Sequence, residues 1–109
     1  MIPSQMLKGV LEGCILEVIR KRETYAYEIS KQLGEYGFGN ISEGTIYPII
    51  LRLQKNELVK STLHDSSSGP KRKYYSLTEK GFSTLNQFKE NWQELDQAVN
   101  ELFIGDDKK

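Results

Sequence analysis

A run of three cations, Lys71, Arg72 and Lys73, is the part of this chain best suited to bind a charged partner. The run follows a Ser/Gly/Pro-rich stretch and leads into Tyr74 and Tyr75. Lys and Arg neutralise phosphate groups, so a flexible turn bearing three of them suits contact with a nucleic-acid backbone or minor groove. The alternative is a solvated run of charge on an ordinary surface. A recognition helix beside the turn would favour the first interpretation.

A group of polar side chains lies at the start of a helix that we expect from residue 42 to residue 53. Ser42 is a suitable cap for it. Thr45 and Tyr47 would lie on its outer side, where hydroxyl groups can bond phosphates or base edges. Tyr47 fits equally well as a half-buried ring that packs under the turn. The inner side would consist of Ile46, Ile49, Ile50 and Leu53.

Three further residues of this helix have less specific roles. Arg52 either reaches a phosphate or lies along the protein surface. Glu43, in the first turn, is a candidate contact to cytosine but is more typical of favourable helix-start electrostatics. Pro48 lies little more than a turn from the start, so we expect a mild distortion of the helix there.

The elements that must position these residues follow the order of a winged helix-turn-helix. Apolar residues recur at helical spacing over residues 4–22. Strands at residues 58–63 and 73–77 would enclose a loose turn at residues 65–70. In this fold the third helix enters a major groove and the wing reaches the neighbouring backbone. A second helix would be capped by Thr24, would bury Tyr25, Ile29 and Leu33, and would bring Tyr27 and Lys31 near the DNA backbone.

Charge is distributed unevenly along the 109 residues, although the net charge is zero. Residues 43–77 carry six Lys/Arg against three Asp/Glu, and residues 78–109 carry four against seven. A polyanion would be attracted to the first segment and repelled by the second. The excess is small, so we expect moderate electrostatic steering.

The last helix, beginning at a Thr78 cap, carries an apolar seam whose spacings alternate between three and four. Residues 79–104 would extend roughly 39 Å as a helix, more than a small winged domain needs to cover its own core. A second copy of the chain is the simplest partner for the surplus. The alternative is a helix folded back on its own domain. The seam consists of Leu85, Phe88, Trp92, Leu95, Val99 and Leu102.

Enzymatic and metal chemistry find little support in the composition. With one Cys and one His, the chain lacks a Ser/His/Asp or Cys/His set and a credible metal site, and we expect no cofactor. Cys14 lies among apolar residues and fits a buried role. No apolar run reaches transmembrane length and the start does not resemble a signal peptide, so we expect a cytoplasmic protein without membrane contact.

Three motifs together resemble the PadR family of bacterial winged-helix transcriptional regulators, which are mostly repressors. They are residues 25–29 (YAYEI), residues 44–48 (GTIYP) with Arg52 and Leu53, and residues 72–81 (RKYYSLTEKG). The single C-terminal helix resembles the short-chain branch of the family. The resemblance implies a DNA-binding homodimer, and not an enzyme.

Within that branch the chain is similar to a multidrug-responsive member that sandwiches flat aromatic drugs between paired Trp side chains. The similarity rests on residues 2–7 (IPSQML) and on Trp92 with Asp96 one turn later. It implies a ligand site at Trp92, Asp96 and Met6. Plain interface packing explains Trp92 equally well. Lys89 stands where that relative has Phe, which puts the same range of drugs in doubt.

The sequence therefore predicts a mainly α fold with a small β-wing: a winged helix-turn-helix over residues 1–77, then a dimerisation helix and acidic tail over residues 78–109. The expected partners are double-stranded DNA with an inverted-repeat operator, a second copy of the chain, and a planar hydrophobic effector that would release a repressor. The DNA-binding candidates are Tyr27, Lys31, Ser42, Glu43, Thr45, Tyr47, Arg52, Lys71, Arg72 and Lys73. The alternative function is a winged-helix module that binds protein instead of DNA.

Overall fold

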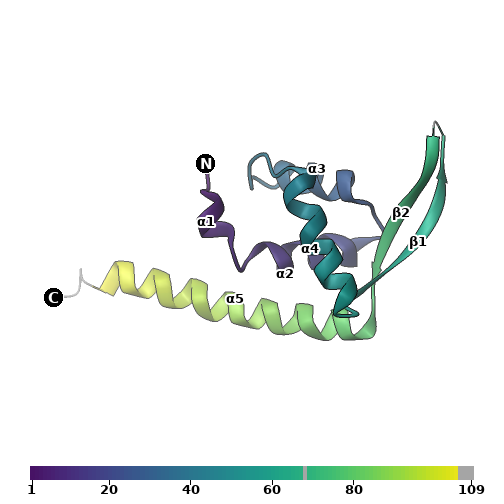
Figure 1. Cartoon of the computed structure of the whole chain (residues 1–109). Helices are drawn as coiled ribbons and strands as arrows, with labels where there is room; N and C mark the ends of the chain where they lie inside the picture. The colour runs from purple at the N-terminus through teal and green to yellow at the C-terminus, as the bar shows by residue number, and fades with distance from the viewer. Residues whose placement is uncertain (68, 106–109) are drawn as a thin grey trace.

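The computed structural model describes residues 1–67 and 69–105. Five helices and a two-stranded antiparallel sheet make up the described part of the chain (Figure 1). The acidic residues expected in the tail beyond residue 105 lie outside it. In chain order the elements are α1 (Ser4–Leu7), α2 (Leu11–Lys21), α3 (Ala26–Glu35), α4 (Glu43–Lys55), β1 (Val59–Ser66), β2 (Gly69–Leu77) and α5 (Glu79–Gly105).

The core lies where α2, α3, α4 and the start of α5 meet the root of the sheet. Its apolar residues recur at helical spacing on each helix, so every helix buries one face. Ile29 and Leu33 are buried on α3, as expected, whereas Tyr25 is only half-buried. The fully buried side chains include Ile15, Leu16, Ile19, Ile29, Leu33, Ile46, Ile50, Leu53, Tyr75 and Leu85.

Two predictions about the first helices are wrong. The expected continuous helix over residues 4–22 is interrupted, because Gly9 adopts a φ of +89°, which few residues other than glycine tolerate. Thr24 does not cap α3: Tyr25 occupies the cap position, without a side-chain cap bond. The Thr24 backbone pairs with Tyr75 instead, through N–H···O bonds of 3.2 and 2.7 Å.

Ser42 caps helix α4, as predicted. The Ser42 side chain accepts a hydrogen bond from the Thr45 N–H at 3.3 Å and satisfies one of the free donors of the first turn. Pro48 lies inside α4 without ending it. Its ring crowds the backbone carbonyl of Gly44, four residues back and in the first turn of the helix.

The wing is longer than the sequence predicted. β1 and β2 continue into the expected loose turn, with Leu63 opposite Lys73 and His64 opposite Arg72, and a bulge between His64 and Ser66. The three cations therefore lie on β2 and not at a flexible tip. Because strand side chains alternate between faces, Lys73 lies on the face opposite to Arg72, and Lys71 adjoins the bulge.

Helix α5 begins after Thr78, whose hydroxyl accepts a hydrogen bond from the Gly81 N–H at 3.0 Å, as predicted for a cap. Its first turns pack on the core, where Gly81 lies against the Leu58 carbonyl with no room for a side chain. The rest of α5 projects away from the winged domain (Figure 1). The longest dimension of the described chain is 62 Å.

Candidate nucleic-acid interface

The outer side of α4 exposes most of the polar residues predicted for DNA contact. Ser42, Glu43 and Thr45 are exposed around the start of the helix. The Ser42 and Thr45 hydroxyl oxygens lie 3.3 Å apart, so each orients the other. Their remaining hydrogen-bonding capacity faces solvent and is available to a phosphate or a base edge.

Tyr47 has features of both predicted roles. Its side chain is 40% exposed, yet its hydroxyl lies close to the buried Tyr75. Burial raises the pKa of Tyr75, and the neighbouring Tyr47 raises it further. Tyr47 thus packs over the root of the wing while part of its ring stays open to a partner.

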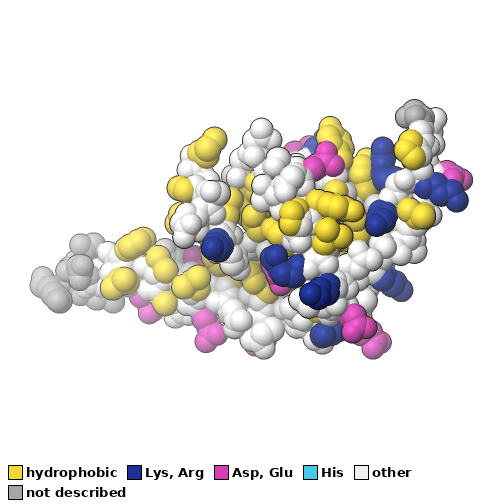
Figure 2. All heavy atoms as spheres, in the orientation of Figure 1, with side chains coloured by type: hydrophobic (Ala, Val, Ile, Leu, Met, Phe, Trp, Pro, Cys, Tyr) yellow, Lys and Arg dark blue, Asp and Glu magenta, His cyan; other side chains and the backbone are white. Residues whose placement is uncertain are grey.

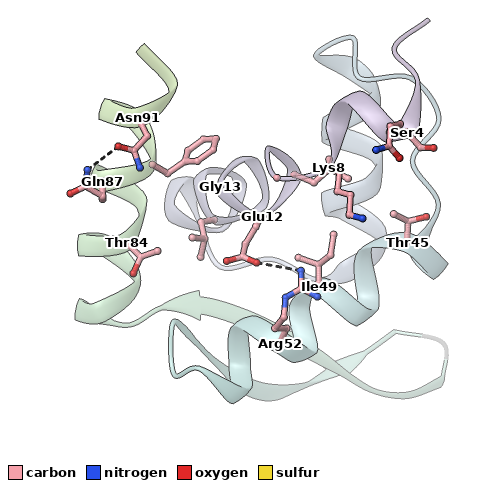
Figure 3. A pocket seen from close by; sticks show the side chains of 15 residues that line it. Ser4, Lys8, Glu12, Gly13, Thr45, Ile49, Arg52, Thr84, Gln87 and Asn91 are labelled. Atoms are coloured by element: carbon pink, nitrogen blue, oxygen red, sulfur yellow. Dashed lines mark hydrogen bonds and ion pairs between the residues drawn. The ribbon is translucent and has the colours of Figure 1, made fainter. Parts of the chain in front are cut away.

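Arg52 is engaged within the chain and does not extend freely toward a phosphate. Its guanidinium forms an ion pair with Glu12 of α2 at 3.3 Å. The pair crosses a cavity of about 840 Å³ between α2, α4 and α5, which Lys8 and Thr45 also line (Figure 3). Of the two predicted roles for Arg52, the geometry favours the one along the surface.

The wing presents its cations on two different faces. Lys71 and Lys73 are exposed, and neither forms an ion pair within the part of the chain that the structure describes. Arg72 instead places its guanidinium 4.2 Å from the centre of the Tyr25 ring. Figure 2 shows Lys and Arg side chains along the wing and the neighbouring helices. Of the three predicted cations, Lys71 and Lys73 are therefore the two available to a polyanion.

Helix α3 contributes two exposed residues, Tyr27 and Lys31. Both line a shallow hollow between α3 and the loop at Gly39 and Asn40. Their side chains lie next to each other on one outer face, as residues four apart on a helix must.

A separate, largely apolar groove of about 590 Å³ brings together the three residues predicted for ligand binding, Met6, Trp92 and Asp96. Trp92 is 45% exposed, so much of its ring is accessible. Cys14 also lines the groove, and burial raises the pKa of its thiol, which favours the neutral form. Asp96 supplies a carboxylate to the groove.

The predicted apolar seam of α5 divides into two parts. Leu85 is 1% exposed and Phe88 packs against the core, where a side chain at Gly13 would collide with its ring. These two residues pack on the chain's own domain, and Phe88 also lines the groove beside Trp92, so their place in a dimer interface stays a prediction. Beyond them, the exposed apolar residues are Trp92, Leu95, Val99 and Leu102, with two that the sequence argument missed, Phe103 and Ile104.

Lys89, the departure noted in the sequence, contacts α2 and not the groove. Its ammonium lies 3.0 Å from the Glu17 carboxylate, which also pairs with Arg20 at 2.8 Å. The hydrogen bond from Arg20 and the pairing with Lys89 lower the pKa of Glu17 to about 2.

No helix among residues 1–67 and 69–105 is long and apolar enough to span a membrane.

Comparison with known proteins places these features in a family context. The sequence profile of the transcriptional regulator PadR-like family matches residues 15–87. An uncharacterized protein of Lysinibacillus sphaericus is 33% identical over 106 residues, which cover 95% of this chain and 96% of that protein. A crystal structure of a PadR-like transcriptional regulator from Bacillus cereus is 54% identical, with a TM-score of 0.82, over 91% of this chain and 96% of that one.

Two further structures extend the comparison. A Streptococcus transcriptional regulator is 42% identical, with a TM-score of 0.81, over 92% of this chain and 98% of that chain. Bacillus subtilis PadR, crystallised in complex with operator DNA, is 26% identical with a TM-score of 0.67. That match covers 73% of this chain and 46% of the longer PadR chain. The solved structures share the winged-helix architecture with the long C-terminal helix.

Proposed function

This chain belongs to the PadR-like family of transcriptional regulators, and we propose that it acts as a homodimeric repressor. Each dimer would bind an inverted-repeat operator in double-stranded DNA, and a planar hydrophobic molecule bound between the subunits would release it. The family consists of transcription factors, so the chain is a regulator and not an enzyme. The observation that carries the proposal is the exposed polar start of α4 beside a wing with unpaired cations.

The DNA-binding step assigns α4 to the major groove and the wing to the flanking backbone. Thr45 and Tyr47 would contact base edges or phosphates, while Lys71 and Lys73 would bind phosphates. Tyr27 and Lys31 of α3 lie beside the same surface and would add backbone contacts. The complex of Bacillus subtilis PadR with operator DNA supports this assignment by analogy.

Dimerisation is supported by the apolar residues that α5 leaves exposed. Trp92, Leu95, Val99 and Leu102 continue the seven-residue spacing past the end of the domain's own core. Covering them with a second α5 would remove a row of large apolar side chains from water. A two-fold dimer would then hold two copies of α4 about 34 Å apart, one turn of DNA, which requires an inverted-repeat operator.

Effector release is supported by the groove at Trp92. An aromatic ring accessible on one side and a carboxylate one turn away suit a flat, cationic, hydrophobic compound. Such a compound would lower DNA affinity only if it binds more tightly to the subunit arrangement that misplaces the two copies of α4.

Fluorescence anisotropy with a labelled duplex from the region upstream of the chain's own gene tests the DNA-binding proposal. We expect binding that is at least about a thousandfold tighter than to a scrambled duplex and that weakens steeply with salt. Equal, weak affinity for both duplexes, together with stable binding to a protein partner, would favour the protein-interaction module instead.

Calorimetry with a planar cationic dye tests the effector site. Replacing Trp92 with Ala should weaken dye binding at least roughly tenfold, because aromatic stacking and cation–π attraction both depend on the ring. Calorimetry is the appropriate readout because Trp92 is the only Trp, so its fluorescence is lost with the substitution. Unchanged affinity in the variant would refute a stacking role.

A further inference from the structure

We propose that Tyr25 is a positioning residue for DNA binding: its ring holds Arg72 and thereby sets the angle at which the wing presents Lys71 and Lys73. The inference rests on the proposed function. Neither the partial burial of Tyr25 nor its position before α3 requires this role. In this proposal Arg72 affects DNA binding through its contact with Tyr25, whereas Lys71 and Lys73 contact DNA directly.

The wing needs such a device because it projects from the domain as two strands only (Figure 1). An isolated two-stranded hairpin is marginally stable, and its outer part is free to swing unless something holds it. At its root, β2 is fixed by the paired backbone bonds between Thr24 and Tyr75. Those bonds lie three residues after Arg72 in the chain, toward the root, so they do not constrain the cationic part of the wing.

Tyr25 lies at the point where this constraint is needed. It directly follows the bridging Thr24 and occupies the cap position of α3, so its backbone belongs to the body of the domain. Its ring centre lies 5.1 Å from that of Tyr74, and the Arg72 guanidinium lies 4.2 Å from the same ring. Arg72 and Tyr74, two residues apart on the same face of β2, therefore both rest on one ring of the domain body.

A second set of contacts holds β1 at the same level of the wing. The His64 ring packs edge-on against Tyr74, with centres 4.6 Å apart, and its Nε2 lies 3.3 Å from a Glu23 oxygen. The Thr62 hydroxyl donates a hydrogen bond of 2.9 Å to the other Glu23 oxygen. Because Glu23 precedes the bridge to β2, these contacts also tie the wing to the domain body. Both strands are thus attached on the face that carries Arg72.

This arrangement leaves the opposite face for DNA. Pairing of Leu63 with Lys73 and of His64 with Arg72 places Lys73 on the face away from Tyr25, and Lys71, which adjoins the bulge, is exposed. A wing held by Arg72 therefore presents both free lysines outward. Loss of the Tyr25 ring would let the wing move and would withdraw both lysines from the backbone at once.

The test compares Tyr25→Leu with Tyr25→Phe in salt titrations of DNA binding, using the full chain and the duplex described above. Neither substitution changes the charge. Tyr25→Leu should weaken binding roughly tenfold and reduce the slope of log K against log salt by up to about 1.8, the value for two lost phosphate contacts. Tyr25→Phe keeps the ring and should bind within about twofold of the wild type. Circular dichroism and thermal unfolding should show both variants folded.

A double-mutant cycle with Arg72→Gln gives an independent readout and remains informative if Tyr25→Leu does not fold well. If the two residues act as one unit, Tyr25→Leu/Arg72→Gln should bind no more weakly than the weaker single variant. Additive losses, an unchanged salt slope in Tyr25→Leu, or an equal loss in Tyr25→Phe would each overturn the proposal. If Lys71→Gln lowers the slope while Tyr25→Leu does not, the proposed function stands and the positioning role fails. Absence of DNA binding by the wild type would refute the proposed function itself.

Discussion

At the scale of single residues, the structure separates side chains that the sequence groups together. The run of three cations was predicted as one DNA-contacting unit on a flexible turn, yet its members lie on a strand and point to two faces. The run itself could be read from the sequence. Its division could not, because it depends on how far β2 extends toward the tip.

Replacing the free lysines with glutamine should therefore weaken DNA binding at every sequence. Lys71→Gln and Lys73→Gln should each reduce the slope of log K against log salt by about 0.9, since each removes one phosphate contact. Lys80→Gln, in the first turn of α5, is the matched control and should leave the slope unchanged. Slopes equal to the wild type in both wing variants would remove the wing from the DNA interface.

Glu17 gives a prediction for the dependence of stability on pH. Its pKa in the folded chain is lowered from 4.5 to about 2, so ionised Glu17 stabilises the folded state above pH 4.5. That contribution should fade as the pH falls from 4.5 toward 2. Because Arg20 and Lys89 are well exposed, solvent screening limits the effect to about 1 kcal/mol.

Urea unfolding of the wild type and Glu17→Gln at equal protein concentration measures this contribution. The free energy of unfolding should differ by up to about 1 kcal/mol at pH 7, and the two proteins should converge near pH 2. A difference that persists undiminished at low pH would show that Glu17 stabilises by packing and not by charge.

At the scale of elements, features set by residues close together in the sequence could be predicted, and contacts between residues far apart in the sequence could not. The caps at Ser42 and Thr78 were recognisable because the capping residue and its partner lie within three positions of each other. The break at Gly9 was missed because the apolar spacing continues across it. The Arg52–Glu12 pair joins residues forty positions apart, and nothing in the spacing of either helix indicates it.

The contact between α2 and α5 depends on Gly13. A Cβ at this position would collide with the Phe88 ring, so Gly13→Ala forces α5 or the ring to shift. We expect a loss of about 1–3 kcal/mol in the free energy of unfolding, as is typical of overpacked cores. Gly44→Ala is the matched control, because its Cβ would meet only the Ser42 hydroxyl oxygen at 3.6 Å.

Chemical denaturation of three proteins checks this prediction: Gly13→Ala, Gly44→Ala and the double variant Gly13→Ala/Phe88→Leu. The smaller, flexible Leu should restore part of the loss by making room for the added methyl group. A Gly13→Ala protein as stable as the wild type would mean that α5 moves freely against α2.

At the scale of the whole molecule, the proposed dimer depends on the protruding half of α5. The sequence predicted a helix longer than its domain needs, and the structure places exposed Trp92, Leu95 and Val99 on it beyond the core. In the part of the seam nearest the domain, Leu85 and Phe88 pack on the chain's own core. The sequence could not show this, because the spacing of apolar residues does not distinguish an internal contact from one between copies. The candidate ligand residues converge on one groove because α1 lies beside α5 there.

Charges placed in the exposed seam should separate the subunits. Leu95→Glu/Val99→Glu introduces carboxylates where two helices would meet, and their burial there is strongly unfavourable. We expect sedimentation velocity at micromolar concentration to find a dimer for the wild type and a folded monomer for this variant. Glu90→Gln/Glu94→Gln, on the same stretch of α5 but outside the seam, is the control and should remain dimeric.

The stoichiometry of the protein–DNA complex tests the account most directly. Sedimentation of the wild-type chain with a labelled duplex from its own upstream region should give two chains per duplex. The Leu95→Glu/Val99→Glu variant should lose most of its affinity for the same duplex. A wild-type complex with one chain per duplex, or a seam variant that binds as tightly as the wild type, would contradict a regulator whose two recognition helices are held in register by α5.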